Sequence, residues 1–218
     1  MCGRFTLTTP TEQIAAQFEV PDPPFLSARY NVAPSQVIAV VGMKPDGKRR
    51  GIALLRWGLV PKWAKGPNDG PRPINVRAES IRHKFGELLR TRRCLIPADG
   101  FYEWIVEGKK KLPRRFTLAS GEPFAFAGLW DVWKGRGETL LTCCLITTTA
   151  NELVREVHDR MPAIVPRESY AEWLDPATPE DRLSEMLVSY PAEHMRVAAA
   201  SAAVNSPKND GPECLEAA

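Results

Sequence analysis

The second residue of the chain is a cysteine, in the stretch MCGRF, and that position gives it two reactive groups. Initiator methionine is usually removed before a side chain as small as cysteine, so we expect the mature chain to begin at Cys2. At neutral pH roughly a tenth of such an α-amine is uncharged, and a small part of a free thiol is thiolate. Together they form a β-aminothiol, whose amine condenses with an aldehyde to an imine that the thiol closes to a thiazolidine. An N-terminal cysteine is also a nucleophile for amide hydrolysis, and Cys2 alone leaves both reactions open.

Two further side chains are suited to proton transfer. Glu103 lies in ADGFYEW, where strand alternation puts it on the same face as Phe101. Desolvation beside an aromatic favours the protonated carboxyl, which suits a proton donor. An exposed glutamate on an edge strand, near Lys109 to Lys111, fits the same stretch of sequence and would have no catalytic role. His158, in HDRMP, ends a helical pattern, and histidine is the residue type most often used for proton transfer in catalysis. A histidine in a last helical turn also serves as a cap or a partner of the helix dipole.

The composition of the chain limits the classes of protein that it can belong to. It has 218 residues, is 44% hydrophobic and carries a net charge of +3. It contains no run of about eighteen apolar residues and no secretory leader pattern, so we expect a cytoplasmic protein without a membrane partner, associated with the nucleoid if the source is bacterial. The five cysteines are odd in number and form no CxxC pair, which predicts free thiols and neither a metal nor another cofactor.

Charge distribution tells more than net charge. Basic residues cluster at Lys48 to Arg50, around Arg77 to Lys84, at Arg90 to Arg93 and at Lys109 to Arg115, whereas acidic residues concentrate after Glu152. Each cluster taken singly is explained by solvated loops and hairpins. The whole-protein field is therefore a weak argument for nucleic acid.

Helical patterns lie at the periphery of the chain. Thr9, Pro10 and Glu12 predict a capping box that opens a short helix with proline at its first position. A second helix is expected over 78–90, and Thr178 is expected to start a third in the same manner.

Strand patterns fill the centre. They are VIAVV from Val37, IALLRW from Ile52, RCLIP from Arg93, FYEWIV from Phe101, RRFTLA from Arg114, FAFAGLW from Phe124 and LLTCCLITTTA from Leu140. Trp57 and the pair Cys143 and Cys144 fall inside these runs, and we expect them to pack in the core. Successive strands without intervening helices predict an α+β fold, a curved and mostly antiparallel sheet or pseudo-barrel with peripheral helices. We expect a single domain over 2–218, with a loose polar tail after about residue 210.

Six stretches together carry a family resemblance. MCGRF, RYNVAP, RWGLVPKW, INVRAES, RRCLIPADGFYEW and HDRMP occur in an order and spacing that resembles the SRAP family, the SOS-response-associated peptidases, which are abasic-site processing proteins. The match runs from Cys2 to about Asn209. The resemblance implies that the N-terminal cysteine captures the open-chain aldehyde of an abasic site, mainly in single-stranded DNA, as a covalent thiazolidine. It also implies lyase and crosslink-reversal chemistry, and we expect a monomer.

The same resemblance implies roles for individual residues. Asn75 would orient the opened sugar and the reacting amine, Glu103 would move protons during ring opening and imine formation, and His158 would assist proton transfer at the sugar. Without the resemblance, Asn75 would be read as a turn residue. Residues implied to contact DNA are Arg4, Arg77 and Arg160 at backbone phosphates and Pro34 with Trp63 as an apolar wedge and stacking platform.

Two other classes of protein fit parts of the sequence. An N-terminal-nucleophile amidohydrolase or peptidase also begins with Cys-Gly, but such enzymes are usually much longer chains with a second domain. A noncatalytic single-stranded DNA-binding module would use Trp63 and the arginines without forming any covalent product. The requirement for an aldehyde and for a free N-terminal amine separates the three hypotheses.

Overall fold

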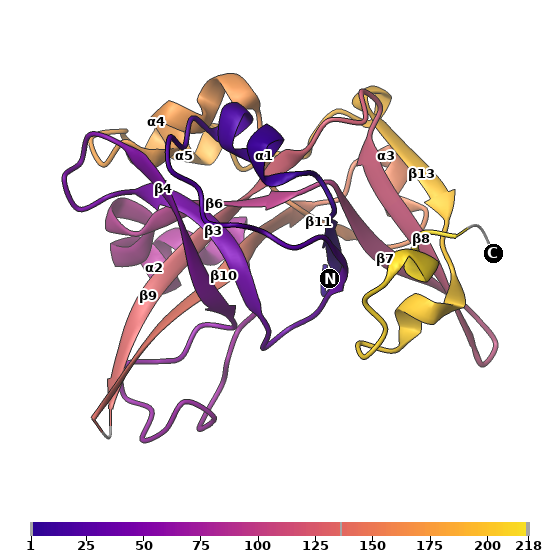
Figure 1. Cartoon of the computed structure of the whole chain (residues 1–218), viewed down its shortest axis with the longest axis horizontal. Coiled ribbons are helices and arrows are strands. Elements are labelled where there is room, and N and C mark those ends of the chain that lie inside the picture. The colour runs from indigo at the N-terminus through magenta and orange to yellow at the C-terminus, as the bar shows by residue number, and fades with distance from the viewer. Residues whose placement is uncertain (1, 136, 217–218) are drawn as a thin grey trace.

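A computed structural model describes residues 2–135 and 137–216 of the chain (Figure 1). Each of the seven strand patterns read from the sequence forms a strand, and the described residues form six further, short strands. The strands are β1 (Phe5–Leu7), β2 (Arg29–Val32), β3 (Val37–Met43), β4 (Arg50–Trp57), β5 (Asn75–Arg77), β6 (Arg93–Ala98), β7 (Gly100–Glu107), β8 (Lys110–Leu118), β9 (Phe124–Gly135), β10 (Glu138–Thr149), β11 (Arg160–Pro162), β12 (Ile164–Val165) and β13 (Met195–Ala199). The helices are α1 (Thr11–Phe18), α2 (Ala78–Thr91), α3 (Glu152–Arg155), α4 (Tyr170–Leu174) and α5 (Glu180–Glu185).

These strands form two sheets. The larger has the order β11-β10-β4-β3-β6-β9-β12, and an additional pairing of β10 with β9 closes its middle strands into a ring. The smaller has the order β13-β8-β7-β1-β2 and is antiparallel throughout. In the larger sheet β10 runs parallel to β4 and β5, whereas its partners β9 and β11 are antiparallel. The predicted α+β class with a curved, mostly antiparallel sheet is confirmed.

Alternate residues of the larger sheet point into two separate hydrophobic clusters. On β3, Val41 packs with residues of α1, α2, α4 and α5, which cover one face of the sheet. Its neighbour Val40 packs on the other face, against Phe5 and Phe101 of the smaller sheet. Because both faces are covered there, β3, β6 and the first half of β9 read as nearly continuous apolar runs. Trp57 lies in the cluster between the sheets, as predicted.

The start of α1 differs from the prediction. We expected Thr9, Pro10 and Glu12 to form a capping box, and this was wrong, because the helix begins at Thr11 with Pro10 as its N-cap and no side-chain cap. The Thr9 hydroxyl donates instead to Asp99 Oδ2 at 3.0 Å. A buried carboxylate therefore takes the hydroxyl that a capping box would have used.

The start of α5 needs the same correction. Pro179 is its N-cap, again with no side-chain cap, and the helix begins at Glu180. The Thr178 hydroxyl donates to the Glu172 carbonyl at 2.6 Å, which ties α5 to the end of α4. In both places the sequence located the helix but misassigned the threonine.

Two irregular segments border the sheets. Residues 58–74 run along the β9–β10 hairpin, where Trp133 Nε1 donates to the Ala64 carbonyl at 3.0 Å. At the other side of the molecule, the chain after β13 packs on β7, and its residues Val204 and Cys214 are buried with Tyr102. Among the described residues, no helix has the length and apolar character needed to cross a bilayer.

Arg93 links the helices to the sheet and yields a stability prediction. Its buried guanidinium donates to the Trp173 carbonyl at 2.6 Å and to the Arg90 carbonyl at 2.8 Å, and it also binds the Leu89 and Asp175 carbonyls. These carbonyls lie at the ends of α2 and α4, where helices leave acceptors unsatisfied.

We therefore expect Arg93→Ala to lower the free energy of unfolding by about 3 kcal/mol, because it leaves buried carbonyls without donors. Urea unfolding followed by circular dichroism measures this change. Arg90→Ala is the control, since Arg90 is exposed and pairs with Glu180 at the surface, where an ion pair contributes at most ~1 kcal/mol. If Arg93→Ala and Arg90→Ala lost the same free energy of unfolding, Arg93 would not be a link between the helices and the sheet.

Candidate active site

Cys2 is fully buried between the two sheets. It packs in the same cluster as Phe5 and Trp57, at the entrance to β1. Strand β1 pairs with β7 through Phe5 opposite Phe101, and the Tyr102 amide donates to the Arg4 carbonyl at 3.0 Å. Because the pairing is antiparallel, the residues before Phe5 run alongside those after Phe101. The N-terminal residues of the chain are thereby held beside β7.

Asn75 reaches Cys2 from the other sheet. Strand β5 is a parallel neighbour of β10, with Asn75 opposite Leu145. The Asn75 Nδ2 donates to the Cys2 backbone carbonyl at 2.7 Å. Its Oδ1 is buried and has no hydrogen-bond partner among the described residues. The amide therefore fixes the backbone of Cys2 through one atom and presents an acceptor with the other.

Glu103 is buried on β7, with 4% of its surface exposed. Phe101 shares its face of the strand and Tyr102 packs on the opposite face, as the alternation predicted. Strand β7 lies between β8 and β1, so Glu103 is not on an edge strand. Burial raises the pKa of the Glu103 carboxyl above its ordinary value, and the charge of His158 acts in the opposite direction. Glu103 is therefore disposed to hold a proton at higher pH than an ordinary glutamate.

The thiol of Cys2 responds to the same environment. Burial raises its pKa far above the ordinary value, and the Glu103 carboxylate raises it further. Its Sγ lies 3.7 Å from the Arg4 carbonyl, which it faces as a weak donor. The neutral thiol is consequently the stable form in the folded protein.

His158 follows α3 and precedes β11. The Arg160 amide donates to its Nδ1 at 2.9 Å, and an Asp159 carboxylate oxygen lies at the same distance from that nitrogen. One nitrogen cannot accept from an amide and donate to a carboxylate at once. The amide is fixed by the backbone, whereas 86% of the Asp159 side chain is exposed, so we assign Nδ1 as the acceptor. In the neutral ring, Nε2 then carries the proton.

Two arginines meet beside Asn75. Arg77 is exposed at the end of β5, opposite Thr147 of β10. Arg160 forms an ion pair with Glu79, with Nη2 2.9 Å from Oε2, and donates to the Thr147 carbonyl at 2.7 Å. The hydrogen bond from Arg160 holds the pKa of Glu79 below its usual range. Glu79 was not identified from the sequence, and its only signal there was an acidic residue in the first turn of a predicted helix.

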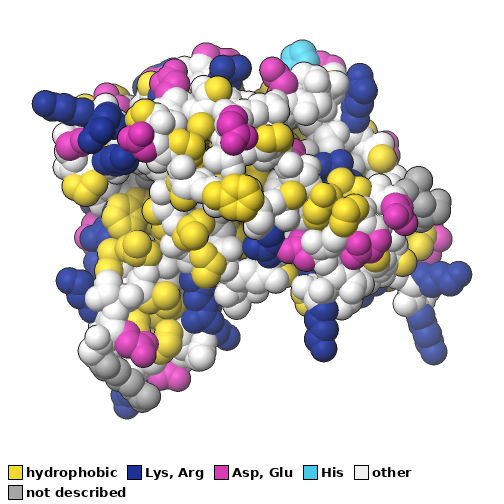
Figure 2. All heavy atoms as spheres, viewed as in Figure 1, with side chains coloured by type: hydrophobic (Ala, Val, Ile, Leu, Met, Phe, Trp, Pro, Cys, Tyr) yellow, Lys and Arg dark blue, Asp and Glu magenta, His cyan; other side chains and the backbone are white. Residues whose placement is uncertain are grey.

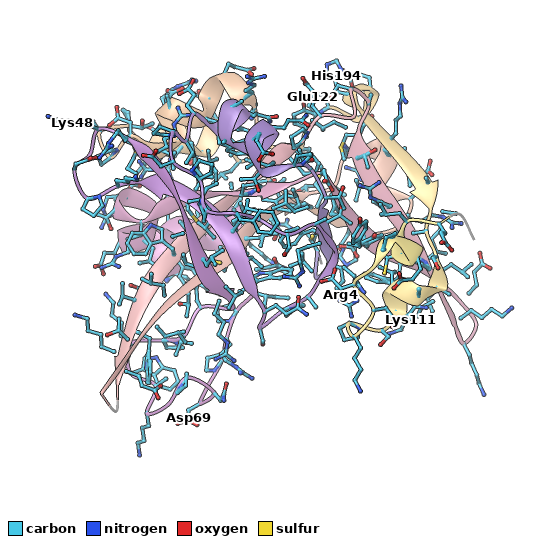
Figure 3. The ribbon with its side chains drawn as sticks, viewed as in Figure 1. Arg4, Lys48, Asp69, Lys111, Glu122 and His194 are labelled. Atoms are coloured by element: carbon cyan, nitrogen blue, oxygen red, sulfur yellow. The ribbon has the colours of Figure 1, made fainter. Side chains whose placement is uncertain are left out.

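Asn75, Arg77 and Arg160 line a groove together with residues of the segment 58–74 and of helix α2. Trp63 projects from that segment with 70% of its surface exposed. Gly70, with φ +74°, backs the Trp63 ring, because a Cβ there would lie 2.7 Å from it. Asp69 marks the tip of the segment in Figure 3.

The other two residues predicted to bind DNA lie outside the set that lines this groove. Pro34 precedes β3 and is half-buried. Arg4 donates to Asn31 Oδ1 at 2.9 Å and to the Val204 carbonyl at 2.7 Å, beside the C-terminal segment (Figure 3). Its guanidinium carbon also lies 5.8 Å from the centre of the Trp104 ring. In the structure Arg4 thus binds protein groups around the entrance of β1.

Between the two sheets the site brings together Cys2, the amide of Asn75 and the buried carboxyl of Glu103. A family model described as SOS response associated peptidase (SRAP) matches residues 1–207. The chain belongs to this family, and the resemblance read from the sequence is confirmed.

Its relatives agree with this assignment. The chain is 44% identical to the abasic site processing protein YoqW of Bacillus subtilis, with 99% of each chain covered. It is 37% identical to the abasic site processing protein HMCES of Gallus gallus, over 78% of this chain and 58% of that protein. An X-ray structure of a protein from Bacteroides thetaiotaomicron superposes with a TM-score of 0.89 at 25% identity, covering 100% of both chains.

The burial of Glu103 yields a prediction for the pH dependence of stability. Because the folded protein raises the pKa of this carboxyl, it binds the proton more tightly than the unfolded chain does. The free energy of unfolding therefore falls as pH rises from about 4.3, the value of an unperturbed glutamate, through the raised pKa. We expect Glu103→Gln to be more stable than the wild type at pH above that range and to lose this advantage below it.

Urea unfolding at pH values on both sides of this range tests the sign. Glu107→Gln on the same strand is the matched control, because Glu107 is exposed. If the difference in free energy of unfolding between Glu103→Gln and the wild type were the same at every pH, the folded protein would not raise the pKa of Glu103.

Proposed function

We propose that the chain captures abasic sites in single-stranded DNA by forming a thiazolidine between Cys2 and the aldehyde of the opened sugar. The observation that carries the proposal is the hydrogen bond from Asn75 to the Cys2 carbonyl, which holds the backbone of Cys2 beside a buried acid. The names of its relatives, abasic site processing proteins, support the same substrate. The reaction requires removal of Met1, so that amine and thiol belong to one residue.

The reaction proceeds in two bond-forming steps. The neutral amine of Cys2 attacks the aldehyde carbon to give a carbinolamine, which loses its hydroxyl as water to form an imine. The thiol then adds to the imine carbon, forming the C–S bond, and its proton passes to the nitrogen. One water leaves overall and no redox partner is needed. A thiol whose pKa is raised by burial suits this order, because it retains the proton that the second step transfers.

Three residues assist these steps. Glu103 in its protonated form gives a proton to the departing hydroxyl and in its ionised form accepts one from the amine. Asn75 Oδ1 accepts a hydrogen bond from the amine or from a sugar hydroxyl. His158 Nε2 donates to the ring oxygen of the sugar as it opens, and it serves imine-mediated strand cleavage and reversal of the crosslink.

The DNA follows the groove beside this pocket. Arg77 and Arg160 bind the phosphates that flank the lesion, and Trp63 stacks on an unpaired base. Arg4 and Pro34 border the strand at the entrance of β1. Stacking and phosphate contacts do not depend on sequence, which suits a protein that recognises a missing base.

The surroundings of the Cys2 thiol argue against an amide hydrolase that relies on a preformed thiolate. A cysteine hydrolase uses a thiolate, and reactive thiolates lie near cations or helix N-termini that lower their pKa. Cys2 has the opposite environment, because burial and the Glu103 carboxylate both raise its pKa. A noncatalytic DNA-binding module would not require the contact between Asn75 and Cys2, because it forms no covalent bond with the DNA.

The covalent step gives the main test. Wild-type protein incubated with single-stranded DNA that contains one abasic site should yield a slowly migrating species that survives denaturing electrophoresis. Cys2→Ala should abolish it, and Cys2→Ser should leave at most a reversible imine, since a hydroxyl closes the ring poorly. One extra residue before Cys2 should have the same effect as Cys2→Ala, because the amine becomes an amide.

The matched control is the same DNA with its abasic site reduced to the alcohol. It keeps every phosphate and base but has no aldehyde, so no crosslink is expected. Persistent attachment to the reduced DNA, or by the protein with a blocked N-terminus, would overturn the proposed chemistry.

The phosphate contact of Arg77 gives an independent test. Arg77→Ala should weaken noncovalent binding of undamaged single-stranded DNA and reduce the slope of log affinity against log salt by about 0.7, the change for one lost contact. Fluorescence anisotropy over a salt series measures the slope. Arg196→Ala is the control, because Arg196 is exposed on β13 and does not line the groove. Identical slopes for wild type and Arg77→Ala would remove Arg77 from the DNA contacts.

A further inference from the structure

The carboxylate of Asp99 gathers the segment that follows β1. Its Oδ2 accepts from the Thr8 hydroxyl at 2.8 Å, the Thr9 amide at 2.8 Å and the Thr9 hydroxyl at 3.0 Å, as well as from the Thr8 amide. Its Oδ1 accepts from the Thr6 hydroxyl and from Arg115. Asp99 is buried, and its own amide donates to the Thr6 carbonyl at 2.9 Å. One side chain thus holds three threonines of the N-terminal segment, Thr6, Thr8 and Thr9.

This anchor lies at the beginning of the strand that carries Glu103. Asp99 directly precedes β7, and β1 pairs with β7 at only two positions, Phe5 opposite Phe101 and Thr6 opposite Gly100. On its other side β1 pairs with β2 through an irregular register. The backbone ladder alone therefore gives β1 few contacts with which to fix its position.

The position of β1 determines where Cys2 lies. Cys2 is three residues before Phe5, so its backbone follows any movement of β1 along β7. A slip of one residue would shift Cys2 by about 3.4 Å and turn alternate side chains to the opposite face. Either change would separate Cys2 from Asn75 and Glu103.

Asp99 and its partners are closely packed around Gly100. Gly100 leaves room for the partners of the carboxylate, because a Cβ there would lie 2.6 Å from Arg115 Nε and 2.9 Å from Thr6 Oγ1. Arg115 comes from β8 and lies 3.3 Å from Asp99 Oδ1. Three strands, β1, β7 and β8, therefore meet at one carboxylate.

We propose that Asp99 is a positioning residue for the N-terminal cysteine, fixing β1 against β7 so that Cys2 stays between Asn75 and Glu103. The inference rests on the proposed function, since it assigns Asp99 to the geometry of the capture reaction. Asp99 acts through the backbone of residues 6–9 and does not contact the DNA.

The first measurement is the rate of crosslinking under saturating abasic DNA. Asp99→Ala should lower it about 100-fold, as expected for a displacement of reacting groups by an ångström or more. Asp99→Asn keeps one acceptor oxygen, so its crosslinking rate should lie between those of Asp99→Ala and the wild type. The DNA concentration for half-maximal rate should stay the same in both variants, because the groove is unaltered. A wild-type rate in Asp99→Ala would overturn the proposal.

The second measurement separates positioning from general instability. All five cysteines are buried in the wild type, so alkylation by iodoacetamide, followed by peptide mass spectrometry, reports local opening. Asp99→Ala should expose Cys2 to alkylation while Cys94, Cys143 and Cys144 stay protected, even though its reaction with abasic DNA is slower. Arg93→Ala, destabilised far from the N-terminal segment, should not expose Cys2 selectively.

The remaining outcomes also decide between the hypotheses. If the Asp99 variants expose all the cysteines together, or if Arg93→Ala slows crosslinking as much as Asp99→Ala does, Asp99 is only a structural residue. A wild-type chain that forms no crosslink would refute the proposed function, and selective alkylation of Cys2 in Asp99→Ala would then still demonstrate the anchor.

Discussion

The site depends on burying the first residues of a chain, which are ordinarily its most mobile part. Cys2 is fully enclosed, and its position is fixed by groups from both sheets: the amide of Asn75 on β5 and the β1–β7 pairing. Burying Cys2, so close to the N-terminus, costs hydration and conformational freedom, so the surrounding contacts must compensate for both. The apolar cluster around Phe5 and Trp57 and the polar anchor at Asp99 supply these contacts from opposite ends of β1.

The same burial determines the protonation states of the site. Removing the thiol and the Glu103 carboxyl from water raises the pKa of both, and the Glu103 carboxylate raises the pKa of the thiol further. Two neutral acids can occupy one dry pocket, whereas two anions would repel. Burial therefore favours the neutral form of both the thiol and the carboxyl.

The long strands were readable from the sequence because their apolar runs are buried on both faces, and β3, β6, β9 and β10 pack into both large clusters. The short strands β1, β5 and β11 were not, since three residues carry too little periodicity. Yet those short strands carry or adjoin Cys2, Asn75 and Arg160. The site residues were named through motifs, and their partners Asp99 and Glu79 became evident only in three dimensions. The misassigned cap at Thr9 has the same cause, because a distant carboxylate competes for that hydroxyl.

Strand β10 explains how separate motifs converge. Near its C-terminal end it pairs with β5 on one side and β11 on the other, so Arg77 lies opposite Thr147 and Arg160 opposite Thr149. The two guanidinium groups would repel if left alone, and Glu79, at the start of α2, binds Arg160 and lies in the field of Arg77. A phosphate in the groove would meet one exposed arginine and one already oriented by a carboxylate. Glu79 therefore fixes the position of the Arg160 guanidinium, whereas the side chain of Arg77 stays exposed.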